Sequence, residues 1–325
     1  MRERPRVITR RQARQYAIPP TGEAEPPGRN LERLDAPIYL AGPSHSEAPI
    51  SIDVAADCSN SWEAHRAALI IAHPGHELRV HHWLERAKPL VLVLTDGSGH
   101  TDQSRLGRTT ALIERAGAAP GRIYGALSDR ALYRAILAGD ADVFIALAQE
   151  IAHVLDHAGV DYVVGDAVEG ANPGHDACRL IINAALMRIE ATRGRRLGNF
   201  EFTLEGPPDA CPPNDRDAAI ILTLGEDAYR RKLEEAQSYS EMAIDLRRAM
   251  HSHQLEAFRT ECLRPVRYGL EIGDCFEHPA LYEGYGEQQV AAGFYTDVIR
   301  FRAHLAPLAE RLGRAAAQVK PAGAP

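Results

Sequence analysis

The chain has 325 residues, of which 45% are hydrophobic, so it can bury a sizeable core and is not a disordered protein. Its 37 basic and 44 acidic side chains leave a net charge of −7, which argues against a nucleic-acid-binding protein. No apolar run approaches the roughly 20 residues that span a bilayer. Five scattered cysteines without a Cys-x-x-Cys pair argue against a disulfide framework and a Cys-rich zinc site. The chain has 14 histidines, a residue type that serves as metal ligand and as acid–base group.

The first 60 residues are predicted to form an irregular arm. Residues 1–15 hold six arginines and one acid, and no apolar segment follows them, so a secretory signal is not expected. Proline and glycine then recur up to about residue 60, which is typical of irregular backbone. We interpret residues 1–60 as a basic, proline-rich arm, with a transit peptide as the alternative, and expect a cytoplasmic protein.

Residues 61–225 alternate between short apolar runs and helical patterns. The apolar runs, interpreted as buried strands, are residues 67–72, 89–95, 122–124 and 160–164. Helical spacing follows at residues 77–88, 109–116, 130–157 and 176–193. Continuous apolar strands separated by helices indicate a parallel sheet covered on both faces. The predicted fold class is therefore α/β, with a Rossmann-like, mostly parallel sheet and helices on both faces.

The chain beyond this domain is predicted to be helical. Two more strand-like runs first complete the domain, at residues 200–204 and 218–224. The pattern is then strongly helical and charged over residues 226–261, and a final helix spans about residues 287–313. We interpret residues 226–325 as a helical C-terminal cap and tail. Residues 278–287 concentrate tyrosines and acids and are expected to form an ordered loop, with a lid or an interface as the alternative.

Three loops follow predicted strands and carry histidines. In open α/β sheets, ligands bind beyond the carboxyl ends of the strands, so loops at this edge are the place to look for a site. The loops after the first, second and fourth strands are residues 72–77, 95–100 and 165–176. Their histidines are His73, His76, His100 and His175.

The spacing of these histidines suggests a metal site. His73 and His76 lie three residues apart at the start of a helix, with Pro74 and Gly75 between them, so both imidazoles can face one ion. His175, at the start of another helix, would complete the set. Three protein ligands and one open position are the arrangement of catalytic zinc, which lowers the pKa of bound water to about 7 and polarises a carbonyl group. The alternative is that these histidines cap helices or fill polar loops.

Residues 72–77 read AHPGHE, and residues 172–175 read NPGH. These segments resemble the AHPDDE and HPDH elements of the PIG-L/LmbE-type zinc-dependent de-N-acetylases. Thr-Asp-Gly at residues 95–97 is also similar to that family, and the resemblance covers about residues 69–186. It implies a Rossmann-like fold and a zinc-bound water that attacks an N-acyl carbonyl, commonly on an amino sugar.

Four positions depart from the family pattern. Gly75 stands where the resemblance implies an aspartate acting as general base, and His76 where it implies a zinc-binding aspartate. Asn172 replaces a histidine implied to assist the transition state, and it keeps a hydrogen-bond donor for an oxyanion. Gly174 replaces a further aspartate. The expected site therefore has three neutral histidine ligands, in a pocket that the two glycines make roomier.

Another carboxylate must then accept the proton of the metal-bound water, and to do so it must come within about 3 Å of that water. Asp96, at the end of the second strand, is the first candidate, and Glu169, after the fourth strand, is the second. Glu77 is a third, and its alternative role is to complement the dipole of the helix that it begins. Asp166 is a further candidate, and its alternative role is to orient a histidine. Asp176 is expected to cap its helix.

The sequence thus predicts a metal-dependent hydrolase, a de-N-acylase that cleaves an N-acyl amide on a small molecule such as an amino sugar or a natural-product intermediate. Asp96, Glu169 and Asn172 are the candidate catalytic residues, and His100 and Arg105 the candidate substrate contacts. Zinc or another divalent transition metal is the expected cofactor, and the pattern is compatible with a homo-oligomer. The alternatives are an enzyme of the same fold with another reaction, such as ester or specialised amide hydrolysis or a non-hydrolytic step, and a non-catalytic relative.

Overall fold

The computed structural model of the chain describes residues 61–99, 103–239, 254–267, 269–273 and 275–318. The arm predicted for residues 1–60 and the candidate substrate contact His100 lie outside the described residues. In this part of the chain, no helix is both long enough and apolar enough to cross a bilayer.

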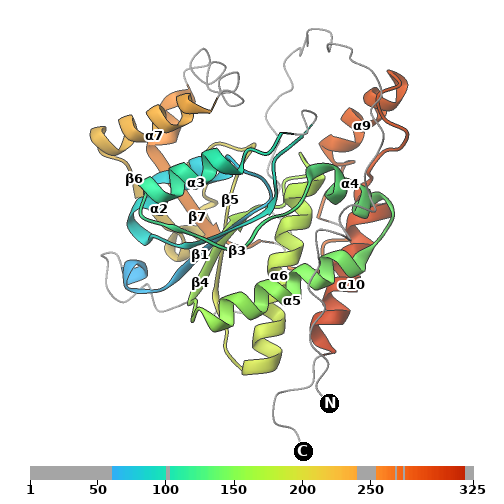
Figure 1. Cartoon of the computed structure of the whole chain (residues 1–325), viewed down its shortest axis with the longest axis horizontal. Coiled ribbons are helices and arrows are strands. Elements are labelled where there is room, and N and C mark those ends of the chain that lie inside the picture. The colour runs from blue at the N-terminus through green and yellow to red at the C-terminus, as the bar shows by residue number, and fades with distance from the viewer. Residues whose placement is uncertain (1–60, 100–102, 240–253, 268, 274, 319–325) are drawn as a thin grey trace, which may run out of the picture. The chain divides into compact units, whose positions relative to one another are not determined.

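A seven-stranded sheet, in the order β3-β2-β1-β4-β5-β7-β6, forms the centre of the described residues (Figure 1). Its strands are β1 (Ala67–Ile71), β2 (Leu90–Thr95), β3 (Ala119–Leu127), β4 (Tyr162–Asp166), β5 (Gly198–Phe202), β6 (Ile220–Thr223) and β7 (Thr260–Pro265). Strands β1 to β5 pair in parallel, whereas β7 pairs antiparallel with β5 and with β6. The mostly parallel sheet is therefore confirmed. The strand order reverses between β1 and β4, which is where open α/β sheets bind ligands.

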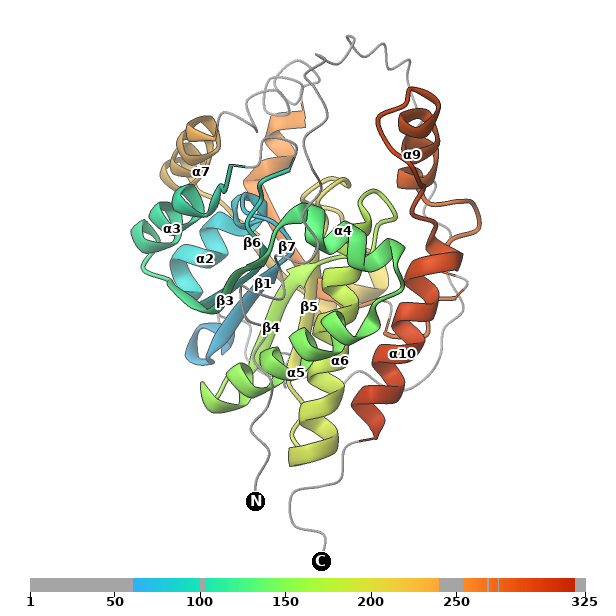
Figure 2. The ribbon, with the colours of Figure 1, turned by 45° about the vertical axis from the view of Figure 1, so that its right-hand side comes forward.

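Helices cover both faces of this sheet, as predicted (Figures 1 and 2). The α-helices are α2 (His81–Ala87), α3 (Leu106–Arg115), α4 (Asp129–Leu137), α5 (Ala141–His157), α6 (Pro173–Arg193), α7 (Glu226–Ser238), α9 (Leu281–Ala291) and α10 (Ala306–Ala317). Helices α2, α3 and α7 lie on one face, α5 and α6 lie on the other, and α10 packs outside α6. Successive side chains of a strand point to opposite faces, so Leu69 and Ile71 share a core cluster with Leu84 of α2 and Leu112 of α3.

The C-terminal region also contributes a strand. The helical pattern predicted over residues 226–261 holds for α7, but the end of that range begins strand β7. Two side chains of β7 are charged yet buried: Glu261 lies 2.8 Å from Lys232 Nζ, and Arg264 lies 3.0 Å from a buried glutamate. Charges inside a core are tolerated when they are paired. These two charged residues interrupt the apolar run by which a buried strand is recognised, so β7 was not predicted. The division between the two domains stays a prediction, and β7 adds a strand from the C-terminal part to the sheet.

The buried ion pair of Lys232 and Glu261 gives a first testable prediction. The two side chains are 3% and 0% exposed, so Lys232→Ala leaves the Glu261 carboxylate buried without its counter-charge. We expect a loss on the order of 3 kcal/mol in the free energy of unfolding, measured by urea denaturation. The matched control is Arg230→Ala on the same helix: this guanidinium is 60% exposed in its ion pair with Asp227, so we expect a loss below about 1 kcal/mol. Equally small losses in both variants would contradict this account of β7.

Candidate functional site

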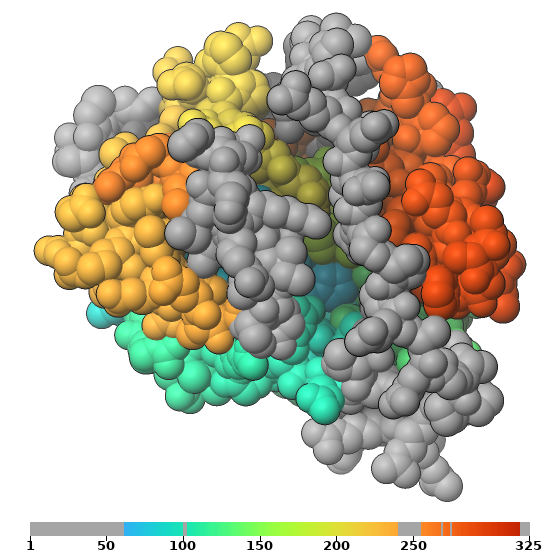
Figure 3. Space-filling view, turned by 90° about the horizontal axis from the view of Figure 1, so that it is seen from above, coloured from blue at the N-terminus to red at the C-terminus, as the bar shows by residue number. Residues whose placement is uncertain are grey.

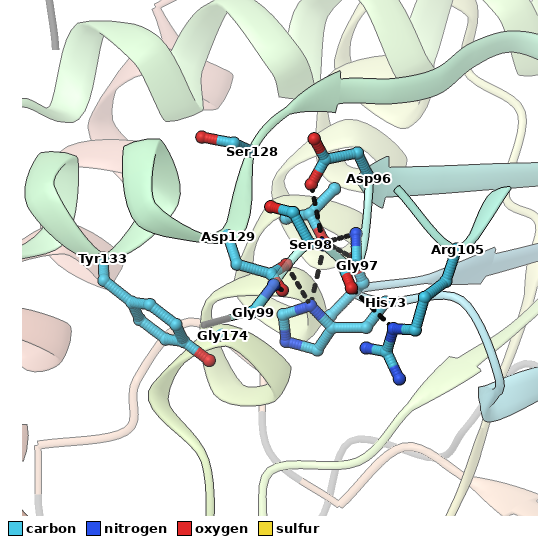
Figure 4. A network of polar contacts seen from close by, with 12 residues as sticks. His73, Asp96, Gly97, Ser98, Gly99, Arg105, Ser128, Asp129, Tyr133 and Gly174 are labelled. Atoms are coloured by element: carbon cyan, nitrogen blue, oxygen red, sulfur yellow. Dashed lines mark hydrogen bonds and ion pairs between the residues drawn. The ribbon is translucent and has the colours of Figure 1, made fainter. Parts of the chain in front are cut away.

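His73 follows strand β1 at the carboxyl edge of the sheet and is buried. Its Nδ1 lies 2.8 Å from Thr95 Oγ1 and 2.9 Å from Asp129 Oδ1 (Figure 4). The Thr95 hydroxyl donates to Ala72 O at 3.0 Å, and a carboxylate only accepts, so Nδ1 of His73 carries the proton. The other ring nitrogen, Nε2, therefore holds a lone pair, as a metal ligand or a proton acceptor requires.

A second carboxylate orients His76 in the same way. The Nδ1 atom of His76 lies 3.0 Å from both oxygens of Asp166, which is fully buried at the end of β4. Asp166 also accepts a hydrogen bond from Ala72 N at 2.8 Å, which holds the carboxylate in place. The turn that presents His76 requires Gly75, whose φ of 107° lies in the left-handed region. Asp166 thus orients a histidine, as predicted, and Nε2 of His76 faces away from that carboxylate.

The three histidines predicted as ligands converge. Their ring centroids are 5.4 Å apart for His73 and His76, 5.3 Å for His73 and His175, and 4.5 Å for His76 and His175. Imidazoles that bind one tetrahedral ion at about 2 Å have centroids about 5 Å apart. His73 Nε2 and His175 Nδ1 are buried and have no hydrogen-bond partner among the described residues. Burial, followed by the neighbouring His76 and His73, lowers the pKa of His175 well below its usual value, so this imidazole is neutral, the form that binds metals.

The three histidine side chains are not placed as they would be around a bound ion. Within the residues that the structure describes, no group of three or more His, Cys, Asp or Glu side chains has the geometry of a metal site. His73 Nε2 faces the start of α6, where a Cβ built on Gly174 would lie 2.9 Å from it. The donor types, the orienting carboxylates and the unpaired nitrogens fit a metal, and coordination would require the rings to shift. The set His73, His76 and His175 therefore stays a prediction.

Gly174 does not widen the pocket. A Cβ at this position would lie 2.9 Å from His73 Nε2, 3.1 Å from Asn172 Oδ1 and 3.2 Å from Leu132 Cδ2. The space is filled on three sides, so the prediction of a roomier pocket is wrong at position 174. At position 75, the left-handed backbone already accounts for glycine.

Replacing Gly174 by alanine is expected to displace His73 and to cost about 1–3 kcal/mol of unfolding free energy through overpacking. The matched control is Gly107→Ala in α3, where a Cβ would meet nothing within 4 Å. This control should stabilise the chain by about 0.5–1 kcal/mol, because alanine is the better helix former. Urea denaturation of both variants checks the prediction, and stabilisation by both would contradict the close packing at Gly174.

Asp96 and Arg105 shape the loop after β2. Asp96 Oδ1 accepts a hydrogen bond from Ser98 N at 2.9 Å, and in Figure 4 this carboxylate points away from the His73 ring. Arg105 Nε donates to Gly97 O at 2.5 Å, so this candidate substrate contact braces the loop. In the described part of the chain, these side chains hydrogen-bond to the backbone of their own loop and not to the three histidines.

Glu169 and Asp176 hold the loop after β4. Both oxygens of Glu169 accept hydrogen bonds from the backbone of residues 204–206, at 2.7 to 3.3 Å. Asp176 Oδ1 accepts from the backbone N–H groups of Glu169, at 3.0 Å, and Gly170, at 3.2 Å, and burial raises the pKa of Asp176 to about 7. Asp176 therefore caps this loop, whereas a cap of its own helix was predicted.

Glu77 is fully buried beneath the turn that carries His76. Its Oε2 accepts a hydrogen bond from Gly75 N at 2.7 Å. Its Oε1 accepts from the hydroxyl groups of Thr109, at 2.8 Å, and of Tyr239. With both oxygens engaged, Glu77 fixes the turn and does not reach the histidines as a proton acceptor.

Asn172 caps helix α6 and meets a tyrosine that sequence reasoning missed. Its Oδ1 accepts from Gly174 N at 2.7 Å and from Tyr133 OH at 3.2 Å, so its NH₂ group is the side left to donate. The Tyr133 ring centroid lies 6.4 Å from that of His73, and burial raises the pKa of Tyr133, so its hydroxyl stays protonated. Asp129 was missed as well. Both residues lie on α4, and the signal that could have found them is that α4 follows β3 at the same edge (Figure 4).

The fold has distant likenesses among solved structures. The zinc-inhibited form of teicoplanin deacetylase Orf2 is 14% identical with a TM-score of 0.45, and the alignment covers 62% of this chain and 97% of that one. A triple mutant of the deacetylase involved in the teicoplanin biosynthetic pathway is 15% identical with a TM-score of 0.43, again over 62% and 97% of the two chains. No family model and no curated protein matches the sequence. Likenesses at this level assign neither an activity nor a metal to the present chain.

Proposed function

We propose that the chain is a metal-dependent hydrolase, a de-N-acylase that cleaves an N-acyl amide on a small molecule. His73, His76 and His175 would hold zinc or another divalent transition metal. The observation that carries the proposal is the convergence of three imidazoles, two of which are oriented by buried carboxylates. Cytoplasmic location and homo-oligomerisation stay predictions.

A bound ion would supply Lewis-acid chemistry toward a carbonyl group and toward water. The chain's own residues prepare the site for it. Asp129 and Asp166 hold the Nδ1 protons of His73 and His76, which turns the Nε2 lone pairs away from these carboxylates. Such a charged partner on a histidine fixes both its tautomer and its orientation.

Asn172 is proposed to stabilise the oxygen of the substrate carbonyl as it gains negative charge. An amide N–H fixed in advance can do so without reorganising during the reaction. Tyr133 and Gly174 N both bind the Asn172 carbonyl, so the NH₂ group is held on the opposite side. This arrangement makes Asn172 a donor only, which suits an oxyanion and not a proton transfer.

Asp96 stays the proposed proton acceptor. Ser98 N binds its Oδ1, whereas the backbone of residues 204–206 binds both oxygens of Glu169. Asp96 must rotate about its side-chain torsions to reach the histidines, since it points away from His73 (Figure 4). Arg105 keeps a proposed role in substrate binding through the loop that it braces.

The test is acetate release by the untagged full chain, loaded with zinc, from a panel of N-acetylated amino sugars and natural-product amines. We expect turnover of at least one compound, and its loss in His175→Ala. Hydrolysis of esters without any amide turnover would favour the alternative reaction on the same fold. Metal binding without turnover of any compound would instead indicate a non-catalytic relative and would contradict the proposal.

A further inference from the structure

Gly170, in the loop that leads to Asn172 and His175, is held at both of its hydrogen-bonding groups. Its φ of 67° lies in the left-handed region, so it forms a turn that a side chain would strain. Its N–H donates to Asp176 Oδ1 at 3.2 Å, and its carbonyl oxygen accepts from Tyr282 N at 3.3 Å. One contact comes from the helix that carries His175 and the other from α9 in the C-terminal region.

The ring of Phe276 covers a further side of Gly170. A Cβ built on Gly170 would lie 2.9 Å from Phe276 Cζ and 3.2 Å from both of its Cε atoms, so the tip of the ring rests against the glycine. Gly170 thus also permits a close approach that a larger residue would block. The Phe276 ring is itself held by Phe301, whose ring meets it edge to face at 76°, with centroids 4.8 Å apart.

The two C-terminal residues that contact Gly170, Phe276 and Tyr282, are called the Gly170 clamp here. They belong to one docked segment. Glu283 of α9 is buried, and its Oε1 accepts a hydrogen bond from Phe301 N at 3.1 Å, which ties α9 to the residue that packs on Phe276. In Figure 3, the orange-red residues of the C-terminal region form one side of the face that is seen from above. The loop after β4 is therefore fastened to the C-terminal region by a packed ring and a hydrogen bond.

Through Gly170, the Gly170 clamp acts on the start of α6. Asp176 Oδ1 accepts hydrogen bonds from the N–H groups of Glu169, at 3.0 Å, and of Gly170, and Asp176 directly follows His175 in the first turn of this helix. Asn172, two residues after Gly170, caps the same helix. A displacement of Gly170 therefore shifts the backbone that places both His175 and Asn172.

We propose that Phe276 is a positioning residue of the candidate site, which holds the loop after β4 in the arrangement that brings His175 beside His73 and His76. This inference rests on the proposed function, because it adds a residue to the same site. Phe276 acts through Gly170 and not on the metal or the substrate. If loss of the ring leaves this arrangement populated for about a tenth of the time, the apparent zinc dissociation constant rises about tenfold, because only the arranged form binds.

The test compares Phe276→Ala with Phe258→Ala in the untagged full chain. Both phenylalanines are partly buried, but Phe258 packs in a separate cluster with Leu224 and Tyr229. The first measurement is hydrogen–deuterium exchange of the metal-free chain over residues 167–176, and the second is zinc affinity by competition with a chromophoric chelator.

We expect Phe276→Ala to exchange about tenfold faster or more over residues 167–176, because local opening becomes easier, and to bind zinc about tenfold more weakly. Phe258→Ala should leave both measurements unchanged. Phe276→Leu keeps an apolar side chain at this position and should recover most of the zinc affinity, which guards against a variant that fails to fold.

Unchanged exchange in Phe276→Ala, or faster exchange with unchanged zinc affinity, would overturn the inference. An equal loss of zinc affinity in Phe258→Ala would do so too, because general damage then explains the result. The proposed function is measured separately, as acetate release by the zinc-loaded chain. Zinc affinity and exchange that both depend on Phe276, without acetate release from any amide, would keep Phe276 as a positioning residue of a metal site and remove the hydrolase proposal. Acetate release with a zinc affinity that does not depend on Phe276 would do the reverse.

Discussion

Replacing His175 by alanine is expected to abolish tight zinc binding and to lower amide hydrolysis by about 10³-fold or more. The reason is the donor set: His175 is buried, its Nδ1 has no partner among the described residues, and its ring lies 4.5 Å from that of His76. Without it, two neutral imidazoles remain, which is fewer than the three protein ligands of catalytic zinc sites. Metal content by elemental analysis and acetate release measure the two effects.

His81→Ala is the matched control for His175→Ala. His81 is also buried, its Nδ1 also lacks a partner in the described part of the chain, and burial lowers its pKa too. It begins α2 and has no ring contact with the three histidines. This variant should lose stability through its cavity but keep its metal. Equal loss of metal from both variants would show that general damage to the fold, and not a missing ligand, explains the result.

Asp166→Asn is expected to weaken zinc binding by about 10–100-fold while the chain stays folded. The carboxylate accepts the Nδ1 proton of His76 at 3.0 Å and the Ala72 N–H at 2.8 Å, and an amide replaces one of its two oxygens with a donor. The His76 ring then loses the charged partner that fixes its tautomer and orientation. Competition with a chromophoric chelator measures the affinity.

The matched control for this second variant is Asp176→Asn, a carboxylate that is also fully buried near the same edge of the sheet. Asp176 accepts hydrogen bonds from the backbone of Glu169 and Gly170, and not from a histidine. Zinc affinity should therefore be unchanged in this control. If Asp166→Asn binds zinc as tightly as the unaltered chain, orientation of His76 by Asp166 has no part in metal binding.

The sheet was predictable from sequence because its central strands are buried on both faces. Continuous apolar runs such as residues 67–72 and 89–95 are short and alternate with helical patterns, which favours buried parallel strands over buried helix segments. Strand β7 was not predicted, because the burial of its charged side chains depends on partners far away in the sequence. These partners are Lys232 for Glu261 and Glu201 for Arg264. No local pattern shows that a charge will be paired inside a core.

The histidines of the candidate site were found for a topological reason. Loops after parallel strands meet at one edge, so His73, His76 and His175 had to lie near one another. Apart from that of Asp166, the roles of the carboxylates could not be derived in this way. Which acid faces a histidine, as Asp129 does, and which binds backbone N–H groups, as Glu169 does, depends on side-chain directions that spacing does not encode.

The reasons for glycine at positions 75 and 174 could not be predicted from the sequence either. A change from aspartate to glycine in a motif suggests empty space, yet Gly174 is pressed against His73 Nε2 and Gly75 holds a left-handed turn. The structure accounts for glycine by close approach at position 174 and by backbone conformation at position 75, two reasons that sequence alone does not separate from a widened pocket.

The central claim, a metal held by three histidines, is tested most directly by elemental analysis of the full chain purified without a histidine tag. The account predicts about one equivalent of zinc or another divalent transition metal per chain, and its loss in each of His73→Ala, His76→Ala and His175→Ala. Less than about a tenth of an equivalent in the unaltered chain, with no further change in His175→Ala, would contradict it.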